Sequence, residues 1–76
     1  MRIVVTVFRK DADFLDSKLD VSEIGLAAAA GLAGIPAERF LDAYPLDGNR
    51  AAALTRLTGI AFDLDTYEYF LEPEAD

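Results

Sequence analysis

The sequence predicts a small α+β domain in which a three-stranded, mainly antiparallel sheet carries two main helices on one face. An unbroken apolar and β-branched run at residues 3–8 is typical of a strand buried on both faces. A second run at residues 66–71 is rich in tyrosine, phenylalanine and threonine, which suit a pleated, half-buried strand. Between these runs lie two helical segments, each followed by a glycine. We expect one domain over residues 1–76 with the element order β-β-α-α-β.

The first strand is expected in the centre of the sheet, paired with both the second and the last strand, because its apolar run leaves no side for solvent. Residues 10–13 are polar and predict a turn. Residues 14–19 then predict a second strand, with Leu15 and Leu19 on one of its faces. The last strand is expected to stop before residues 73–76, which begin with proline and predict a frayed acidic tail.

The first main helix is predicted over residues 21–33, because both of its ends carry capping signals. Asp20 can serve as the N-cap, and Glu23 can reach back to it as in a capping box. Gly34 is suited to the left-handed conformation that commonly ends a helix. The body of this helix consists almost entirely of small residues, which allow it to lie close to the sheet.

A short helix and a second main helix are predicted in the middle of the chain. The short helix is expected over residues 36–41, since proline is favoured in a first helical turn. Residues 43–46 are expected to be extended, as the residue before a proline prefers. The second main helix is predicted over residues 48–58, with Asp47 as its N-cap and Gly59 as its C-cap.

The predicted core takes one apolar face from each element. Its expected members are Ile3, Val5, Val7, Ile24, Phe40, Leu54, Leu57 and Phe62, with at least one of Tyr67 and Tyr69. At 76 residues such a core is only marginally sufficient, and no cysteine is present to add a disulfide. Small domains of this kind often gain stability by binding a partner or by oligomerising, so a homodimer is one expectation.

The composition argues against catalysis and against nucleic-acid binding. The net charge of −7 repels phosphate backbones and anionic membranes, whereas a basic protein is its natural counterpart. Histidine and cysteine are both absent, which removes the commonest general base and the thiolate nucleophile. We expect no enzyme activity, no cofactor, no bound metal and no membrane association. Because Arg9 and Lys10 end the first apolar run too early for a signal peptide, we expect a cytoplasmic protein.

The spacing Asp11-x-Asp13-x-x-Asp16 resembles the start of a calcium-binding loop, because carboxylate oxygens there could converge on a hard cation. An EF-hand loop that begins at Asp11 would need glycine at its sixth place and glutamate at its twelfth. Asp16 and Ser22 stand at those places instead. We therefore predict a solvated turn and no metal site.

The run of acidic and aromatic residues near the end of the chain is the feature with a functional interpretation. Tyrosine is enriched at binding hot spots, and carboxylates beside it would steer a cationic protein surface. The alternative is that the tyrosines pack in the core and the carboxylates only solvate the surface. The residues predicted to bind a partner are Asp63, Asp65, Tyr67, Glu68 and Glu72.

The segments Gly34-Ile-Pro36, Tyr44-Pro-Leu46 and Phe62-Asp-Leu-Asp-x-Tyr-x-Tyr-Phe-Leu-Glu72 together resemble a family of small, uncharacterised, acidic bacterial domains. Members of that family end in a similar Asp-Leu-Asp-x-Tyr-Asp-Tyr-Phe segment, from which this sequence departs at Glu68. Some members accompany polymorphic toxin systems. The resemblance implies a binding and inhibitory role. Together with the net charge and the missing catalytic residues, it predicts an immunity-type inhibitor that neutralises a basic toxin by occluding its surface. The alternative is a homo-oligomeric structural or accessory protein.

Overall fold

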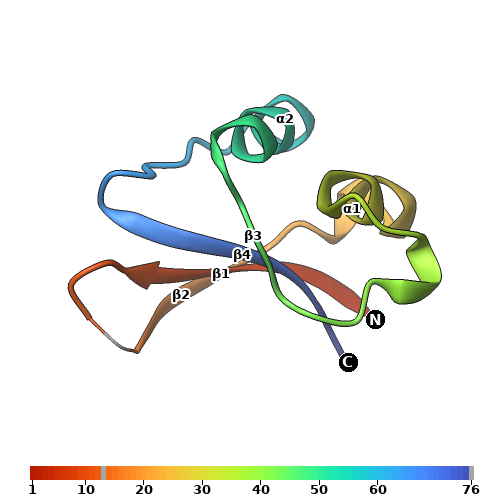
Figure 1. Cartoon of the computed structure of the whole chain (residues 1–76), viewed down its shortest axis with the longest axis horizontal. Helices are drawn as coiled ribbons and strands as arrows, with labels where there is room; N and C mark the ends of the chain where they lie inside the picture. Colours follow the sequence, from red (N-terminus) through yellow and green to blue (C-terminus); the bar gives the residue numbers. More distant parts are fainter. Residues whose placement is uncertain (13, 76) are drawn as a thin grey trace.

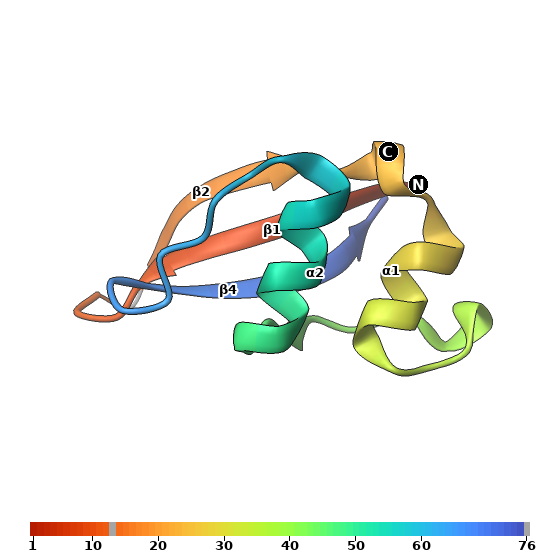
Figure 2. The ribbon, with the colours of Figure 1, turned by 90° about the horizontal axis from the view of Figure 1, so that it is seen from above.

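A four-stranded antiparallel sheet with both helices on one face makes up the fold (Figures 1 and 2). The computed structural model describes residues 1–12 and 14–75. Its elements are β1 (Arg2–Arg9), β2 (Leu15–Asp20), η1 (Ser22–Ile24), α1 (Leu26–Ala33), η2 (Ala37–Arg39), β3 (Tyr44–Pro45), α2 (Gly48–Thr58) and β4 (Tyr67–Glu74). The strand order β2-β1-β4-β3 confirms the α+β class and the central position of the first strand.

The strand that the sequence did not predict is β3. Tyr44 pairs with Leu71 and Pro45 pairs with Phe70, so two residues suffice to extend the sheet by one strand. The Leu46 N–H then donates to the Tyr69 carbonyl oxygen at 2.9 Å. Extended backbone was expected here, but the expectation of three strands was wrong, because pairing with a segment far along the chain leaves no local signal.

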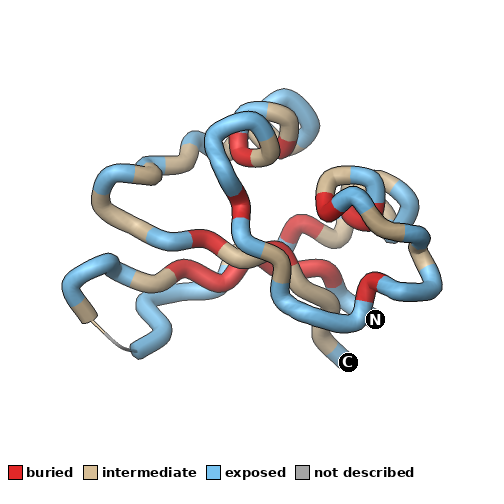
Figure 3. Tube along the Cα trace, in the orientation of Figure 1, coloured by how far each residue is buried: buried red, intermediate tan, exposed pale blue. Residues whose placement is uncertain are grey.

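Alternate residues of β1 serve the two faces of the sheet. Ile3, Val5 and Val7 belong to the core beneath the helices, whereas Val4 and Thr6 are buried on the opposite face. Figure 3 shows the buried positions concentrated in the middle of the sheet and on the inner turns of α1 and α2. Burial on both faces is what the unbroken apolar run predicted.

A bulge in the β1–β2 hairpin corrects the predicted faces of the second strand. Val7 pairs with Ser17 but Phe8 pairs with Leu15, so the register skips one residue of β2. The skipped residue places Leu15 on the face opposite to Leu19, because side chains alternate along a strand. Leu19 packs against the core, whereas Leu15 is 41% exposed on the face without helices.

The first predicted helix is divided in two by Gly25. The turn η1 ends there, and α1 starts only at Leu26, because Gly25 adopts a φ of +84° that no helix contains. The carboxylate of Asp20 accepts the Ser22 N–H at 2.8 Å, and in the described chain no side chain caps α1. One continuous helix over residues 21–33 with a capping box was therefore wrong. The left-handed C-cap at Gly34 (φ +76°) is confirmed.

The second helix, α2, has the predicted bounds and caps. Asp47 Oδ1 accepts the Arg50 N–H at 2.8 Å, and Gly59 closes the helix with a φ of +78°. Its buried face includes Ala51 and Leu54. Leu57 was expected in the core, but it is 53% exposed because it lies on the flank of the helix beside that face.

The other core predictions mostly hold. Ile3, Val5, Val7, Phe40, Leu54 and Tyr69 are buried, while Ile24, Phe62 and Tyr67 are partly buried against them.

The short helix η2 is one turn, shorter than the predicted residues 36–41, and Pro36 precedes it in an extended conformation.

The last strand does not stop at Pro73. β4 continues through Glu74, which forms ion pairs with Arg2 and with Lys18. Main-chain groups of Tyr69 point to the outer edge of β4, where Leu46 binds. Pro73 is four residues further on and has the same orientation, so its missing N–H breaks no bond to β1. Ala75 is exposed, and Asp76 lies outside the described residues.

Candidate functional site

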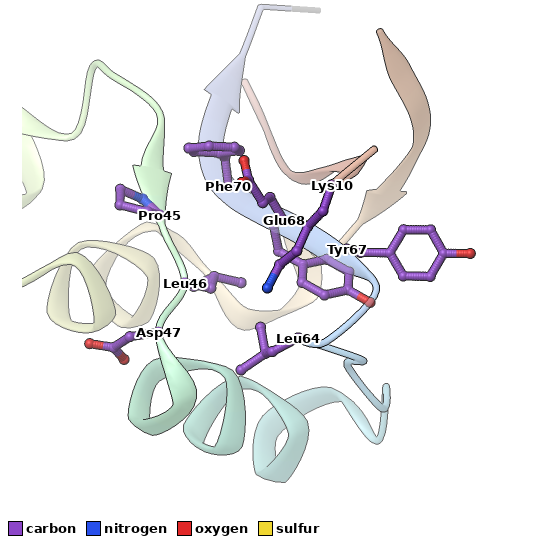
Figure 4. A pocket seen from close by; sticks show the side chains of 9 residues that line it. Lys10, Pro45, Leu46, Asp47, Leu64, Tyr67, Glu68 and Phe70 are labelled. Atoms are coloured by element: carbon purple, nitrogen blue, oxygen red, sulfur yellow. The ribbon is translucent and has the colours of Figure 1, made fainter. Parts of the chain in front are cut away.

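An open groove of about 460 Å³ lies at the outer edge of β4, where β3 ends and the chain rises into α2 (Figure 4). Its lining comes from three segments that are distant in sequence. The lining residues are Lys10, Pro45, Leu46, Asp47, Leu64, Tyr67, Glu68, Tyr69 and Phe70. The shortness of β3 creates this groove, because its two paired residues leave the start of β4 without a strand along its outer edge.

The groove has an apolar lining and a charged rim. Leu46, Leu64 and Phe70 are among its apolar lining residues. Asp47 is already engaged as the N-cap of α2. Lys10 crosses the groove toward the leucines in Figure 4. Glu68 is exposed and forms no ion pair among residues 1–12 and 14–75, so its carboxylate is the rim group free to receive a cation.

Tyr69 fixes the position of the loop that borders the groove. Its hydroxyl oxygen accepts the Asp63 N–H at 2.9 Å, and its ring meets Phe62 edge to face with centroids 4.9 Å apart. The side chain is buried, so Tyr69 connects the loop after α2 to the sheet. Its role is structural, as the alternative interpretation of the aromatic run expected for some of these residues.

Asp63 shapes the loop that leads into β4. Its Oδ1 atom accepts the N–H groups of Asp65 at 3.2 Å and of Thr66 at 3.3 Å. Hydrogen bonds from Thr66 are the main reason that the pKa of Asp63 lies below its ordinary value. Asp63 therefore stabilises a turn, and both Asp63 and Asp65 are exposed.

The remaining predicted residues lie on the two faces of β4. Tyr67 points to the helix side, where the Arg9 guanidinium lies 6.0 Å from its ring centroid. Glu68 and Glu72 share the opposite face, as their spacing predicted. Glu72 Oε2 accepts a hydrogen bond from the Thr6 hydroxyl at 2.9 Å. Of the five predicted residues, Tyr67 and Glu68 line the groove, and Asp63, Asp65 and Glu72 do not.

A model of a family described as a domain of unknown function, DUF7683, matches residues 2–72. The chain belongs to the DUF7683 family. The match spans nearly the whole sheet and both helices, and it agrees with the expected resemblance to an uncharacterised family. Searches of curated proteins and of solved structures returned no match.

Sequence reasoning missed most of the groove in this DUF7683 domain. Lys10 reaches it because the Lys10 N–H donates to the Thr66 carbonyl at 3.1 Å, which ties the end of β1 to the start of β4. Leu46 and Leu64 arrive from the segments before and after α2. A partial signal existed in the isolated leucine between Asp63 and Asp65, since a lone apolar residue in a polar loop often packs inward.

Residues 1–12 and 14–75 contain neither a metal-ligand cluster nor a membrane-spanning helix. No group of three or more acidic residues there is arranged to hold a metal ion. The turn predicted around Asp11, Asp13 and Asp16 stays a prediction, because Asp13 lies outside the described residues. None of the described helices is long and apolar enough to cross a membrane.

Proposed function

We propose that this DUF7683 domain is a non-enzymatic module that binds a basic protein, in the manner of an immunity protein that neutralises a basic toxin. The observation that supports the proposal best is the exposed, unpaired carboxylate of Glu68 on the rim of an apolar groove, in a chain of net charge −7. The resemblance to domains that accompany toxin systems supplies the inhibitory role. The cytoplasm is its proposed location.

The groove suits a partner side chain that is long, partly apolar and cationic. An arginine or lysine stem would bury its methylenes against Leu46 and Leu64, and its charged head would meet Glu68. Inhibition would follow by occlusion, because cationic groups that hold the toxin's own substrate would be covered. No chemical step by this chain is needed.

The net charge contributes mainly to the rate of encounter. Complementary fields steer association and fall off with salt, whereas apolar anchors such as those in the groove slow dissociation. Tyr67 adds a partly exposed aromatic ring to the groove lining, on the face of β4 opposite to Glu68, and such rings are common hot spots.

The proposal is tested by affinity capture from native cell extract, followed by mass spectrometry. The bait carries either Asp65→Asn with Glu68→Gln, beside the groove, or Glu38→Gln with Asp42→Asn, near η2 at the other end of the molecule (Figure 1). All four carboxylates are exposed, so both variants lose the same charge without loss of buried contacts. We expect wild type and the η2 variant to recover one basic protein at low salt, and the groove variant to recover much less.

Equal recovery by both charge variants would contradict the proposed site, and recovery of no basic protein would contradict the function. Lys10→Gln tests the proposal in the opposite direction, because this variant should capture more of the basic partner. This change removes a cation from the groove, so capture of a basic partner should improve. A weaker capture would mean that Lys10 itself binds an acidic group of the partner.

A second candidate function is a homo-oligomeric structural role, which the position of β2 favours. β2 forms one edge of the sheet over six residues, and an edge strand can pair with a second copy. Its charged residues Lys18 and Asp20 oppose such pairing in general. Mass measured by light scattering over a range of concentrations distinguishes the two: a constant monomer mass excludes the oligomer, and a rising mass favours it.

A further inference from the structure

The face of the sheet without helices has two dissimilar ends. One end lies beside the chain termini, and the other lies toward the β1–β2 turn (Figures 1 and 2). At the terminal end, Val4 and Thr6 are buried although no helix covers them. Charged side chains close this end: Glu74 forms ion pairs with Arg2 and, at 2.6 Å, with Lys18.

The other end of this face is apolar and has no such cover. Phe8 and Phe70 meet edge to face with ring centroids 5.7 Å apart. Leu15 lies opposite Phe8 across the bulge and is 41% exposed. We call Phe8, Leu15 and Phe70 the Phe8 patch. Phe14, the next residue to Leu15, is 70% exposed.

A carboxylate without an ion pair among the described residues borders the Phe8 patch. Glu68 is the cross-strand partner of Phe8, so its carboxylate borders the patch. The two basic residues on this face of β1 and β2, Arg2 and Lys18, are both paired with Glu74. A complementary surface therefore presents apolar side chains flanked by cations.

Phe8 and Phe70 of the patch offer side chains and no free backbone, because β1 is hydrogen-bonded to strands on both sides and Phe70 of β4 lies between β1 and β3. Leu15 belongs to the edge strand β2. A strand added to that edge would lie beside β2 and would not cover the rings of Phe8 and Phe70. An amphipathic helix can supply an apolar stripe while its own backbone groups stay paired.

We propose that the Phe8 patch is the docking site for a cationic amphipathic helix of the partner, which would form a third layer on the open face of the sheet. This inference rests on the proposed function, because it takes the same basic protein as the occupant. Phe70 belongs to the patch and Glu68 borders it, and both residues also line the groove, so the two surfaces meet along β4. The partner would then contact β4 both in the groove and on the Phe8 patch.

The test uses a synthetic amphipathic helical peptide of leucine and lysine, titrated into the isotope-labelled protein and followed by NMR chemical shifts. Three proteins are compared: wild type, Leu15→Asp on the patch, and Leu57→Asp on α2. Both leucines are exposed, so both variants should fold, which circular dichroism checks. We expect amide shifts centred on Phe8, Leu15, Glu68 and Phe70. Leu15→Asp should weaken binding about tenfold, and Leu57→Asp should leave it unchanged.

Two results would overturn the inference. The first would leave the proposed binding of a basic protein intact, and the second would contradict it as well. Salt-dependent binding with shifts only in the groove, around Leu46 and Leu64, and no effect of Leu15→Asp would remove the Phe8 patch but keep the basic partner. No saturable binding at low salt would count against the patch and against the preference for cationic proteins.

Discussion

Replacement of Leu54 by alanine should remove a large part of this domain's free energy of unfolding, whereas the same change at Leu57 should have little effect. The Leu54 side chain is fully buried beneath α2, so the change removes about 2.4 kcal/mol of transfer free energy at about 0.8 kcal/mol per methylene. The cavity left behind raises the cost to about 3 kcal/mol. For a domain of this size, this corresponds to a fall in Tm of about 12–24 °C.

Leu57 provides the matched control, because it is the same residue type on the same helix but 53% exposed. Leucine and alanine have similar helix propensities, so neither change perturbs the helix itself by much. Leu57→Ala should cost less than about 1 kcal/mol. Urea denaturation followed by circular dichroism gives both values. Equal destabilisation by the two variants would refute the packing of α2 described above.

Three further predictions concern caps and charge, and urea denaturation measures each. Asp47→Ala removes the side chain that accepts the N–H of residue 50 and should cost about 1 kcal/mol; no loss would mean that the cap is not formed in solution. Gly59→Ala places a side chain at a φ of +78° and should also cost about 1 kcal/mol, whereas Gly48→Ala in the first turn of α2 should be neutral or stabilising. The ion pair with Lys18 lowers the pKa of Glu74 below its ordinary value of 4.5, so the carboxylate stabilises the fold at pH above that value. The stability difference between wild type and Glu74→Gln should therefore vanish as the pH falls through the lowered pKa; a difference that persists in acid would exclude this origin.

Features set by neighbouring residues were predictable from the sequence. Asp47 and Gly59 mark the ends of α2 because capping depends on the type of residue at one position. The central position of β1 followed from its apolar run. Gly25 was not recognised as a break, because a glycine inside a small-residue helix gives no sign of the conformation it adopts.

The register and the extent of strand pairing were not predictable. The bulge that turns Leu15 away from the core depends on the register between β1 and β2. The strand β3 depends on contact with β4, and Pro73 is tolerated because it lies at an outer edge that the sequence does not mark. In the groove, Tyr67 and Glu68 were found from local composition, whereas Lys10 and Leu46 were brought there by the fold.

The decisive measurement for the proposed function is the association rate of the captured basic protein with wild type and with Glu68→Gln, at about 50 and about 200 mM salt. If Glu68 and the groove receive a cationic surface, the wild-type rate should fall about tenfold between these salts, and the variant should be slower and less sensitive to salt. Identical rates and identical salt dependence for the two proteins would contradict the proposal that Glu68 receives the partner.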